Sequence, residues 1–448
     1  MAELIISVSG LRGIVGENLT PEIAARFVAA FVDLLPAGPI VVGRDGRSHG
    51  PLLAGGVQQA ITRAGRECLY ADVASTPTIG VLVRDLHAAG GVQISASHNP
   101  PQYNGLKLFG ADGRVISAGE GARVIEGFRR TTTDGPTSGA ATGKVTSLAD
   151  TTTAHLHKVL ATVDVEAIRR RKFRVVLDAN HGAGAVLGKP LLEALGCTTT
   201  VLGGAADGRF EHPPEPTAEN LTSVAEAVRR AAADVGFCQD PDADRLALFD
   251  EQARYIGEEY TPALCADHVL ARAAGAVVTN CSTSRMTQDV AAKYKLPFSR
   301  SAVGEANVCD EMIAQNAVFG GEGNGGVIDP RVGYVRDSFA GMALMLDLLA
   351  ARSEPLSRVA ASLPRYEIVK TKMTLDADRW RAGPAALRKH FADAAASTLD
   401  GLRLDWPDKW LLVRASNTEP IVRAIAEAPT AAEAQRLCDE AQHVLARL

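Results

Sequence analysis

Hydrophobic residues along the first three quarters of the chain alternate between helical and strand spacing. Thr20 is a suitable N-cap residue, and the segment after it carries apolar residues at i, i+4, i+8 and i+12, namely Ile23, Phe27, Phe31 and Leu35. A β-branched run, PIVVGRDGRS, comes next, followed by a helical pattern over 52–65 and a strand pattern over 67–73. This alternation is typical of an α/β fold.

The same pattern recurs twice further along the chain. FRVVLDANHGAGAV starts at Phe173 and GAVVTNCSTSRM starts at Gly275, and in each an apolar strand enters a polar or glycine turn before a helix. We therefore expect three α/β units, with breaks near 131–144, 250–258 and 353–367. The last helix is amphipathic and is predicted to cover a small sheet with Leu437, Ala441, Val444, Leu445 and Leu448.

Composition narrows the classes of partner. The 448 residues suffice for roughly three domains, with four also compatible. Basic and acidic residues number 47 and 52, so the net charge of −5 disfavours a nucleic-acid or anionic-membrane partner and suits a small metabolite. The seven cysteines form no C-x-x-C pair, and we find neither a secretory leader nor an apolar run of membrane-spanning length. We expect a soluble cytoplasmic protein.

The segment ISASHNPPQYNG follows the predicted strand AAGGVQI, at the strand end where α/β sheets place ligands. Ser95 to Asn104 would form the loop. Taken alone, S-x-S-H is typical of a surface turn. A Ser-His-Asp hydrolase fits less well, because no G-x-S-x-G elbow is present and His98 would point away from Ser97 in an extended chain.

The segment GFCQDPDADRLALFD contains three alternating aspartates, Asp240, Asp242 and Asp244. Carboxylates this close repel one another unless a cation lies between them, and oxygen ligands favour a hard ion such as Mg²⁺. A calcium-binding EF-hand would place Glu251 at its twelfth position but requires glycine where Arg245 stands, and RLALFD is predicted as a strand. A solvated acidic turn is disfavoured by the apolar flanks.

Two further segments suit a phosphosugar. VFGGEGNGGVID carries Glu322 and Asn324 among glycines that let the backbone approach a ligand, although glycine-rich turns are common. In RASNTEPIVR two arginines flank hydroxyl and amide groups that could converge on one phosphate, and a plain turn is equally compatible. The polar residues of that segment are Arg414, Ser416, Asn417, Thr418 and Arg423.

Together the segments SASHNPPQYNGLK, DPDADR, GEGNGG and RASNTEP resemble, in this order, the four signature loops of the α-D-phosphohexomutases. That family includes phosphoglucomutase, phosphomannomutase and phosphoglucosamine mutase. SGLRGIVG, VGRDGRS and FEHPPEPTAENL support the resemblance. It implies three α/β domains with mixed sheets and a smaller C-terminal α+β domain around a central cleft. With the breaks above, the domains are expected at 1–148, 149–253, 254–364 and 365–448.

The resemblance also implies roles for individual residues. Ser97 aligns with the family's phosphoserine. In the family this residue gives its phosphoryl group to a hexose monophosphate and recovers one from the bound 1,6-bisphosphate. The hexose 1,6-bisphosphate also serves as the primer of the enzyme. Mg²⁺ would be held by the three aspartates and an oxygen on Ser97. Arg12 and Arg245 would add positive charge, and Lys107, ahead of His98, would transfer the proton, since both can titrate near other cations.

The remaining roles concern the sugar and its distal phosphate. Glu322 and Asn324 would hold ring hydroxyls, and the RASNTEPIVR residues would anchor the non-reacting phosphate. The family loop G-E-x-S-G-H has serine and histidine where this chain has Asn324 and Gly326, so no role of that histidine transfers. Ala415 and Asn417 also replace the family's common proline and glycine.

Several alternatives stay open. Glucosamine phosphate is the leading substrate, with glucose or mannose phosphate as the alternative and N-acetylglucosamine phosphate not excluded. An aspartyl-phosphate phosphatase also has a strand entering D-x-D, but it needs Thr or Val two places after its second aspartate, where Asp244 stands, and it leaves Ser97 without a role. A phosphosugar sensor without turnover is a third class. The chain is expected to be a monomer or a homodimer.

Overall fold

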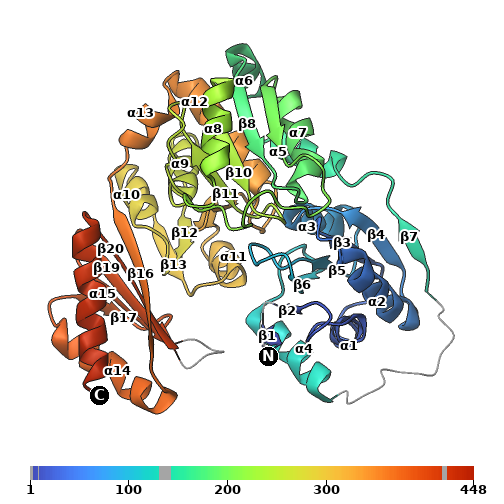
Figure 1. Cartoon of the computed structure of the whole chain (residues 1–448), viewed down its shortest axis with the longest axis horizontal. Helices are drawn as coiled ribbons and strands as arrows, with labels where there is room; N and C mark the ends of the chain where they lie inside the picture. The colour runs from blue at the N-terminus through green and yellow to red at the C-terminus, as the bar shows by residue number, and fades with distance from the viewer. Residues whose placement is uncertain (1–3, 9, 131–142, 416–420) are drawn as a thin grey trace.

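The computed structural model describes residues 4–8, 10–130, 143–415 and 421–448. The described residues form three mixed α/β domains and an antiparallel C-terminal domain, arranged in chain order around the molecule (Figure 1). This arrangement confirms the predicted fold class.

The first domain is built on a sheet of order β1-β2-β6-β5-β3-β4-β7. Strands β3, β4, β5 and β7 are parallel, whereas β6 runs antiparallel to both β5 and β2. The strands are β1 (Ile5–Ser7), β2 (Gly10–Ile14), β3 (Ile40–Arg44), β4 (Cys68–Val73), β5 (Gly90–Ile94), β6 (Tyr103–Gly110) and β7 (Val145–Ser147). The helices are α1 (Pro21–Val32), α2 (Gly50–Arg63), α3 (Thr76–Asp85) and α4 (Ala118–Arg130).

Helix α1 begins where the sequence predicts it but ends earlier. The Oγ1 of Thr20 accepts a hydrogen bond from the N–H of Ile23 at 3.3 Å, and the helix then buries Phe27 and Phe31. It ends at Val32, so Leu35 packs against the core from outside the helix. The prediction that Leu35 continues the helix is wrong because the following Pro36 disfavours helical backbone at the residue before it.

The second and third domains each have a smaller sheet, of order β11-β10-β8-β9 and β13-β12-β14-β15. The elements of the second domain are α5 (Thr153–Leu160), α6 (Val165–Arg171), β8 (Arg174–Asp178), α7 (Gly184–Ala194), β9 (Thr198–Leu202), α8 (Thr222–Ala231), β10 (Val235–Gln239) and β11 (Leu246–Phe249). Those of the third are α9 (Tyr260–Leu270), β12 (Val277–Asn280), α10 (Met286–Lys293), β13 (Phe298–Ser301), α11 (Glu305–Ala314), β14 (Phe319–Glu322), β15 (Gly326–Ile328), α12 (Ser338–Arg352) and α13 (Leu356–Ala361).

One strand arrangement is repeated in all three α/β domains. Strands β3, β8 and β12 are the central strands that the recurring sequence pattern predicts. Each pairs in parallel with the second strand of its unit (β4, β9 or β13) on one side and with the third strand (β5, β10 or β14) on the other. A fourth strand, β6, β11 or β15, then returns antiparallel to the third. The turn between the third and fourth strands therefore lies at an equivalent place in each domain.

The second and third domains share one hydrophobic core. Helix α12 packs against α9 of the third domain and against α5, α6 and α7 of the second. Its residues from Ser338 to Leu349 are all buried, as expected for a helix covered on every side. The turns of these two domains are thus held on a common support.

The C-terminal domain has an antiparallel sheet of order β16-β20-β19-β18-β17 with two helices. Helix α15 covers it with Leu437, Ala441 and Leu445, as predicted, whereas Leu448 lies beyond the helix and is exposed. The elements are β16 (Glu367–Thr374), α14 (Ala377–His390), β17 (Ala395–Ser397), β18 (Leu402–Asp405), β19 (Trp410–Ala415), β20 (Ile421–Ala428) and α15 (Ala431–Ala446).

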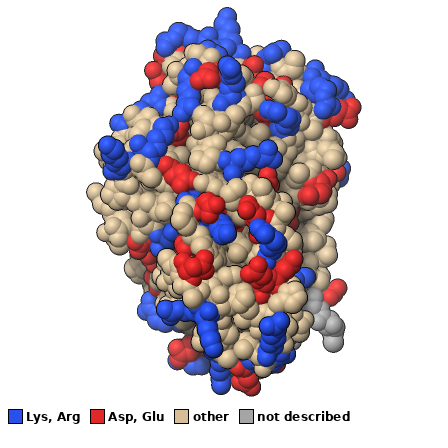
Figure 2. Space-filling model, turned by 90° about the vertical axis from the view of Figure 1, so that its left-hand side faces the viewer, with Lys and Arg blue, Asp and Glu red and all other residues tan. Residues whose placement is uncertain are grey.

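The surface and the helices add two observations. Figure 2 shows basic and acidic side chains interspersed over the face that carries the C-terminal domain, in keeping with the small net charge. Among the helices of the described ranges, none combines the length and apolar character needed to cross a membrane.

Candidate active site

The three equivalent turns carry the segments that the sequence singles out. The serine segment lies between β5 and β6, the aspartates between β10 and β11, and the Gly-rich segment between β14 and β15. Asn104, predicted in the loop, belongs to β6, which already begins at Tyr103. Two cavities of about 520 and 440 Å³ meet at these turns and share Val303, Glu322 and Asn324 in their walls.

Ser97, and not Ser95, faces the aspartates. The Oγ of Ser97 donates a hydrogen bond to the Oδ2 of Asp240 at 2.6 Å. Ser95 instead supports the loop, because its Oγ accepts from the N–H of Ser97 at 2.9 Å and donates to Asp45 at 2.7 Å. Both serines are buried. The two hydroxyls therefore have different tasks.

The prediction that His98 points away from Ser97 is wrong. Ser97 has φ +49°, so the chain is left-handed there and not extended. This turn brings the Nδ1 of His98 to 3.3 Å from the Ser97 Oγ. Burial, together with the charges of Arg245 and Arg12, lowers the pKa of His98 to about 2. The imidazole is therefore neutral at physiological pH.

Arg47 supports the backbone of the serine loop. The sequence analysis did not predict it as a site residue. Its guanidinium is buried and pairs with Asp45 at 3.1 Å. It donates hydrogen bonds of 2.7 to 3.1 Å to four main-chain carbonyls of the loop, those of Ser97, Asn99, Pro100 and Tyr103. VGRDGRS thus acts by fixing the backbone around Ser97.

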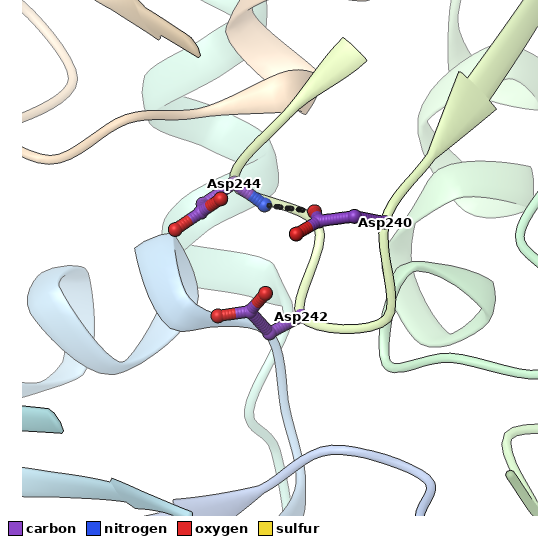
Figure 3. A group of neighbouring side chains, drawn as sticks. All are labelled: Asp240, Asp242 and Asp244. Carbon is purple, nitrogen blue, oxygen red and sulfur yellow. Dashed lines mark hydrogen bonds between the residues drawn. The ribbon is translucent and has the colours of Figure 1, made fainter. Parts of the chain in front are cut away.

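The three aspartates fit a divalent cation (Figure 3). Each of Asp240, Asp242 and Asp244 offers a carboxylate oxygen within 4.8 Å of the others, and all three side chains are fully buried. The Oδ1 atoms of Asp242 and Asp244 lack a hydrogen-bond partner among the described residues. Buried carboxylate oxygens without partners are costly, and a hard cation would satisfy them.

Lys107 holds the other oxygens of the same carboxylates. Its Nζ donates to the Oδ2 of Asp242 and to the Oδ2 of Asp244, each at 2.6 Å. Burial alone would lower the pKa of Lys107, but these two aspartates raise it instead. The expectation that nearby cations make Lys107 titrate is therefore wrong in its physical reason, because its nearest charged partners are carboxylates.

The aspartates themselves have shifted pKa values. Burial and the charges of Asp242 and Asp244 raise the pKa of Asp240. Burial also acts against ionisation of Asp242, but the charge of Lys107 and hydrogen bonds from Lys107 and Thr76 lower its pKa overall. The Thr76 hydroxyl lies 2.5 Å from the Oδ2 of Asp242 and ties the first domain to this turn.

Two predicted arginines lie beside this cluster. The Nε of Arg245 is 3.9 Å from carboxylate oxygens of both Asp240 and Asp244, and Arg245 lines the larger cavity. Arg12 lines the smaller cavity together with Lys107, and burial lowers its pKa. The structure thus brings both guanidinium groups to the region around Ser97.

Arg336 connects the turn between β14 and β15 (the sugar turn) to the turn between β10 and β11 that carries the aspartates (the metal turn). The sequence analysis did not predict this arginine as a site residue. Glu322 accepts from the amide of Asn280 at 2.6 Å and from Arg336 at 2.8 Å, while the half-buried Asn324 lines both cavities. The same Arg336 donates to Asp244 at 2.6 Å. No motif marks this arginine, whose partners lie in other loops.

Two of the residues predicted to bind phosphate, Arg414 and Arg423, form a row of basic side chains with Lys372 across three strands. Arg414 on β19 lies directly opposite Arg423 on β20, which in turn lies opposite Lys372 on β16. Directly opposed residues share a face of the sheet, so these three basic side chains lie on the same face. Arg414 is paired with Asp400 at 3.3 Å, whereas Ser416, Asn417 and Thr418 lie outside the described residues.

Family models match nearly the whole chain. The four models for phosphoglucomutase/phosphomannomutase, three for its alpha/beta/alpha domains I, II and III and one for its C-terminal domain, match residues 4–134, 153–254, 258–366 and 369–444. The chain belongs to the α-D-phosphohexomutase family. It is a phosphohexomutase, an isomerase.

Individual phosphohexomutases agree with this assignment. The chain is 35% identical over 444 residues to a phosphoglucomutase/phosphomannomutase of Thermococcus kodakarensis, covering 95% of each. It is 34% identical over 448 residues to a probable phosphoglucosamine mutase of Methanopyrus kandleri, covering 98% of this chain and 97% of that one. A phosphoglucomutase/phosphomannomutase family protein of Burkholderia thailandensis has a crystal structure with a TM-score of 0.84 at 25% identity, and 98% of each chain is covered.

Gly325 allows the turn between β14 and β15 of this phosphohexomutase to pack against the start of β11. Gly325 has φ +80°, its C=O accepts from the N–H of Leu246 at 3.1 Å, and a Cβ on it would lie 2.3 Å from the Leu246 carbonyl oxygen. We expect Gly325→Ala to lower the free energy of unfolding by roughly 2 kcal/mol or more, measured by urea denaturation.

Gly55 in helix α2 is the matched control for this substitution. A Cβ there meets nothing within 4 Å, so Gly55→Ala should leave stability unchanged or raise it by about 0.5–1 kcal/mol. Equal effects of the two substitutions would contradict the close approach of the turn to β11.

Proposed function

We propose that this enzyme interconverts hexose 6-phosphate and hexose 1-phosphate through a phosphoserine at Ser97 and a bound hexose 1,6-bisphosphate. The observation that carries the proposal is the position of the buried Ser97 Oγ, which lies 2.6 Å from the Oδ2 of Asp240. The other two aspartates of that turn, Asp242 and Asp244, each have one oxygen without a hydrogen-bond partner among the described residues. A hydroxyl beside such a cluster suits a phosphoryl carrier, because transfer depends mainly on positioning and on charge stabilisation.

We propose Asp240, Asp242, Asp244 and an oxygen on Ser97 as the ligands of Mg²⁺, which when bound would act as a Lewis acid on the transferring phosphoryl oxygens. Lys107 orients two of the carboxylates from the opposite side. Arg12 and Arg245 would add positive charge where negative charge develops.

Proton transfer to and from the sugar hydroxyl is assigned first to Lys107 and second to His98. Lys107 lies in the wall of the smaller cavity, and because its pKa, despite burial, is raised by Asp242 and Asp244, its proposed part is to donate a proton to the oxygen that leaves the phosphoryl group. His98 lies 3.3 Å from the Ser97 Oγ, but its lowered pKa makes it a weak base, so it is placed second.

The distal phosphate is proposed to bind at the cationic row of the C-terminal domain. Lys372, Arg423 and Arg414 occupy adjacent strands, and Lys372 and Arg423 line the larger cavity. Guanidinium forks suit phosphate. Ser416, Asn417 and Thr418 stay proposed as further ligands, and Glu322 and Asn324 as ligands of ring hydroxyls.

Glucosamine phosphate is the proposed leading substrate, with glucose or mannose phosphate as the alternative. The larger cavity has carboxylates as well as cations in its wall, and these could attract the ammonium group of an amino sugar while the cations hold phosphate. The carboxylates are those of Glu215, Glu258, Glu259 and Glu322. The relatives' names are divided between the same two substrate groups.

A substrate panel tests both the reaction and the preference. Glucosamine, glucose, mannose and N-acetylglucosamine 6-phosphates are supplied with Mg²⁺ and a hexose 1,6-bisphosphate primer, and 1-phosphates are followed by ³¹P NMR. We expect isomerisation of glucosamine 6-phosphate and of at least one neutral hexose phosphate. Release of inorganic phosphate without isomerisation, or binding without turnover, would contradict the proposed function.

A further inference from the structure

Arg336 lies where the metal turn, the sugar turn and the start of α11 meet. It directly precedes Asp337, whose side chain caps α12 by accepting from the N–H groups of Phe339 and Ala340. Its backbone is thereby fixed at the end of a helix that is buried on all sides. Only 9% of the Arg336 side chain is exposed, and that part lines the smaller cavity.

Three carboxylates from three segments contact this one guanidinium. Arg336 donates to the Oδ2 of Asp244 at 2.6 Å and to the Oε2 of Glu322 at 2.8 Å. Its Nε lies 3.4 Å from Glu305, which also accepts from the Arg336 main-chain N–H at 2.7 Å. Glu305 and Glu322 are buried like Asp244, so water cannot replace the arginine without a change in structure.

Gly326 provides the space for this side chain. A Cβ on Gly326 would lie 2.3 Å from the Cδ of Arg336 and 2.9 Å from its Cγ. The φ of Gly326 is not in the left-handed region, so its backbone alone does not require glycine. The glycine at the position of the family histidine therefore admits an arginine stem that reaches both turns.

We propose that Arg336 is a positioning residue that couples the metal site to the sugar-binding turn, so that cation and sugar phosphate strengthen each other's binding. The inference rests on the proposed function. Arg336 holds the Oδ2 of Asp244, while the Oδ1 has no hydrogen-bond partner among the described residues and would be available to a cation, and it holds Glu322 in the wall that both cavities share. A planar fork fixes both carboxylates at once, which a lysine ammonium does not.

Coupling of this kind is reciprocal and measurable without turnover. The Kd of glucose 6-phosphate is measured by calorimetry on the full chain in its dephosphorylated form, which has no phosphoryl group to transfer, once with saturating Mg²⁺ and once with EDTA, and the ratio of the two values is the coupling factor. We expect a ratio of about five or more in the wild type, within the usual range for linked sites. Titrations of sugar phosphate into Mg²⁺ without protein correct for the complex in solution.

Two variants disturb the contact in different ways. Arg336→Lys keeps the charge but loses the fork, and Gly326→Ala keeps the arginine but displaces its stem. Both should bring the coupling factor close to one and should raise the Mg²⁺ concentration needed for half-maximal activity. Arg331→Lys is the matched control, since Arg331 pairs with Asp329 on the same segment outside the site, and it should leave the factor unchanged.

The outcomes separate the inference from the function on which it rests. A wild-type factor of one in an enzyme that isomerises hexose phosphates overturns the inference alone. An unchanged factor in folded Gly326→Ala protein also overturns it, even if Arg336→Lys fails to fold. A wild-type protein without mutase activity overturns the proposed function, and the substrate panel shows this independently.

Discussion

Replacement of Ser97 by alanine is expected to reduce mutase turnover by about 10⁴-fold or more, because the phosphoryl carrier is lost and water cannot act in its place. Ser97 is the hydroxyl that contacts Asp240, so no other described side chain of the loop is placed to take over its task. The measurement combines turnover with intact-mass analysis and peptide mapping. Wild-type protein should carry one phosphate on Ser97, and the variant none.

Ser95→Ala is the matched control, only two residues away. The Ser95 hydroxyl supports the Ser97 N–H and Asp45 but does not face the carboxylates. We expect a loss of about tenfold, as for the removal of supporting hydrogen bonds with a combined effect of about 1–1.5 kcal/mol on the barrier, with the phosphate still on Ser97. Phosphate mapped to Ser95, or retained turnover in Ser97→Ala, would contradict the mechanism.

Removal of divalent cations is expected to have the second largest effect. EDTA-treated enzyme should lose about 10³-fold in turnover, since a Lewis acid supplies several kcal/mol of charge stabilisation, and Mg²⁺ should restore it. Mg²⁺ should also raise the thermal midpoint, because a cation that binds the folded chain stabilises it by mass action. Both effects are measured on the same dephosphorylated preparation, the turnover by coupled assay with the hexose 1,6-bisphosphate primer added and the midpoint by differential scanning fluorimetry without it.

Asp242→Asn tests the site assignment within this experiment. It removes a charge from the cluster and from the partner of Lys107, so the Mg²⁺-dependent rise in midpoint should disappear. Asp207→Asn in the same domain is the control, because Asp207 is 40% exposed and pairs with His181, which is not a member of the aspartate cluster. Full activity after exhaustive chelation, or an unchanged midpoint shift in Asp242→Asn, would rule out the aspartates as the metal site.

The alternation of strands and helices could be predicted because it depends on local pattern. Thr20 caps α1 through its own side chain, and the apolar strands β3, β8 and β12 lie within short runs of sequence. The end of α1 was less predictable, since the apolar spacing continues to Leu35 although Pro36 stops the helix. Ser97 shows the same limit, because no local pattern announces its left-handed backbone.

The missed site residues share a different cause. Arg336 reaches Asp244 from 92 positions away, and Arg47 reaches Ser97 from 50 positions away. Lys372 becomes part of the cationic row only through the pairing of β16 with β20. Such partners are set by domain packing and strand register, which a single sequence without these contacts does not reveal. The departure at Gly326 is visible in the sequence, but the side chain that fills its space is not.

The repeated strand arrangement places the proposed tasks of the enzyme on separate turns. Each α/β domain presents one turn after its third strand, and the three turns carry in order the proposed phosphoserine, the proposed cation site and the proposed sugar contact. A change of hexose preference is therefore expected to involve the β14–β15 turn together with the wall carboxylates Glu215, Glu258 and Glu259 of the larger cavity. Their exchange between relatives should shift specificity while the Ser97 and aspartate turns stay intact.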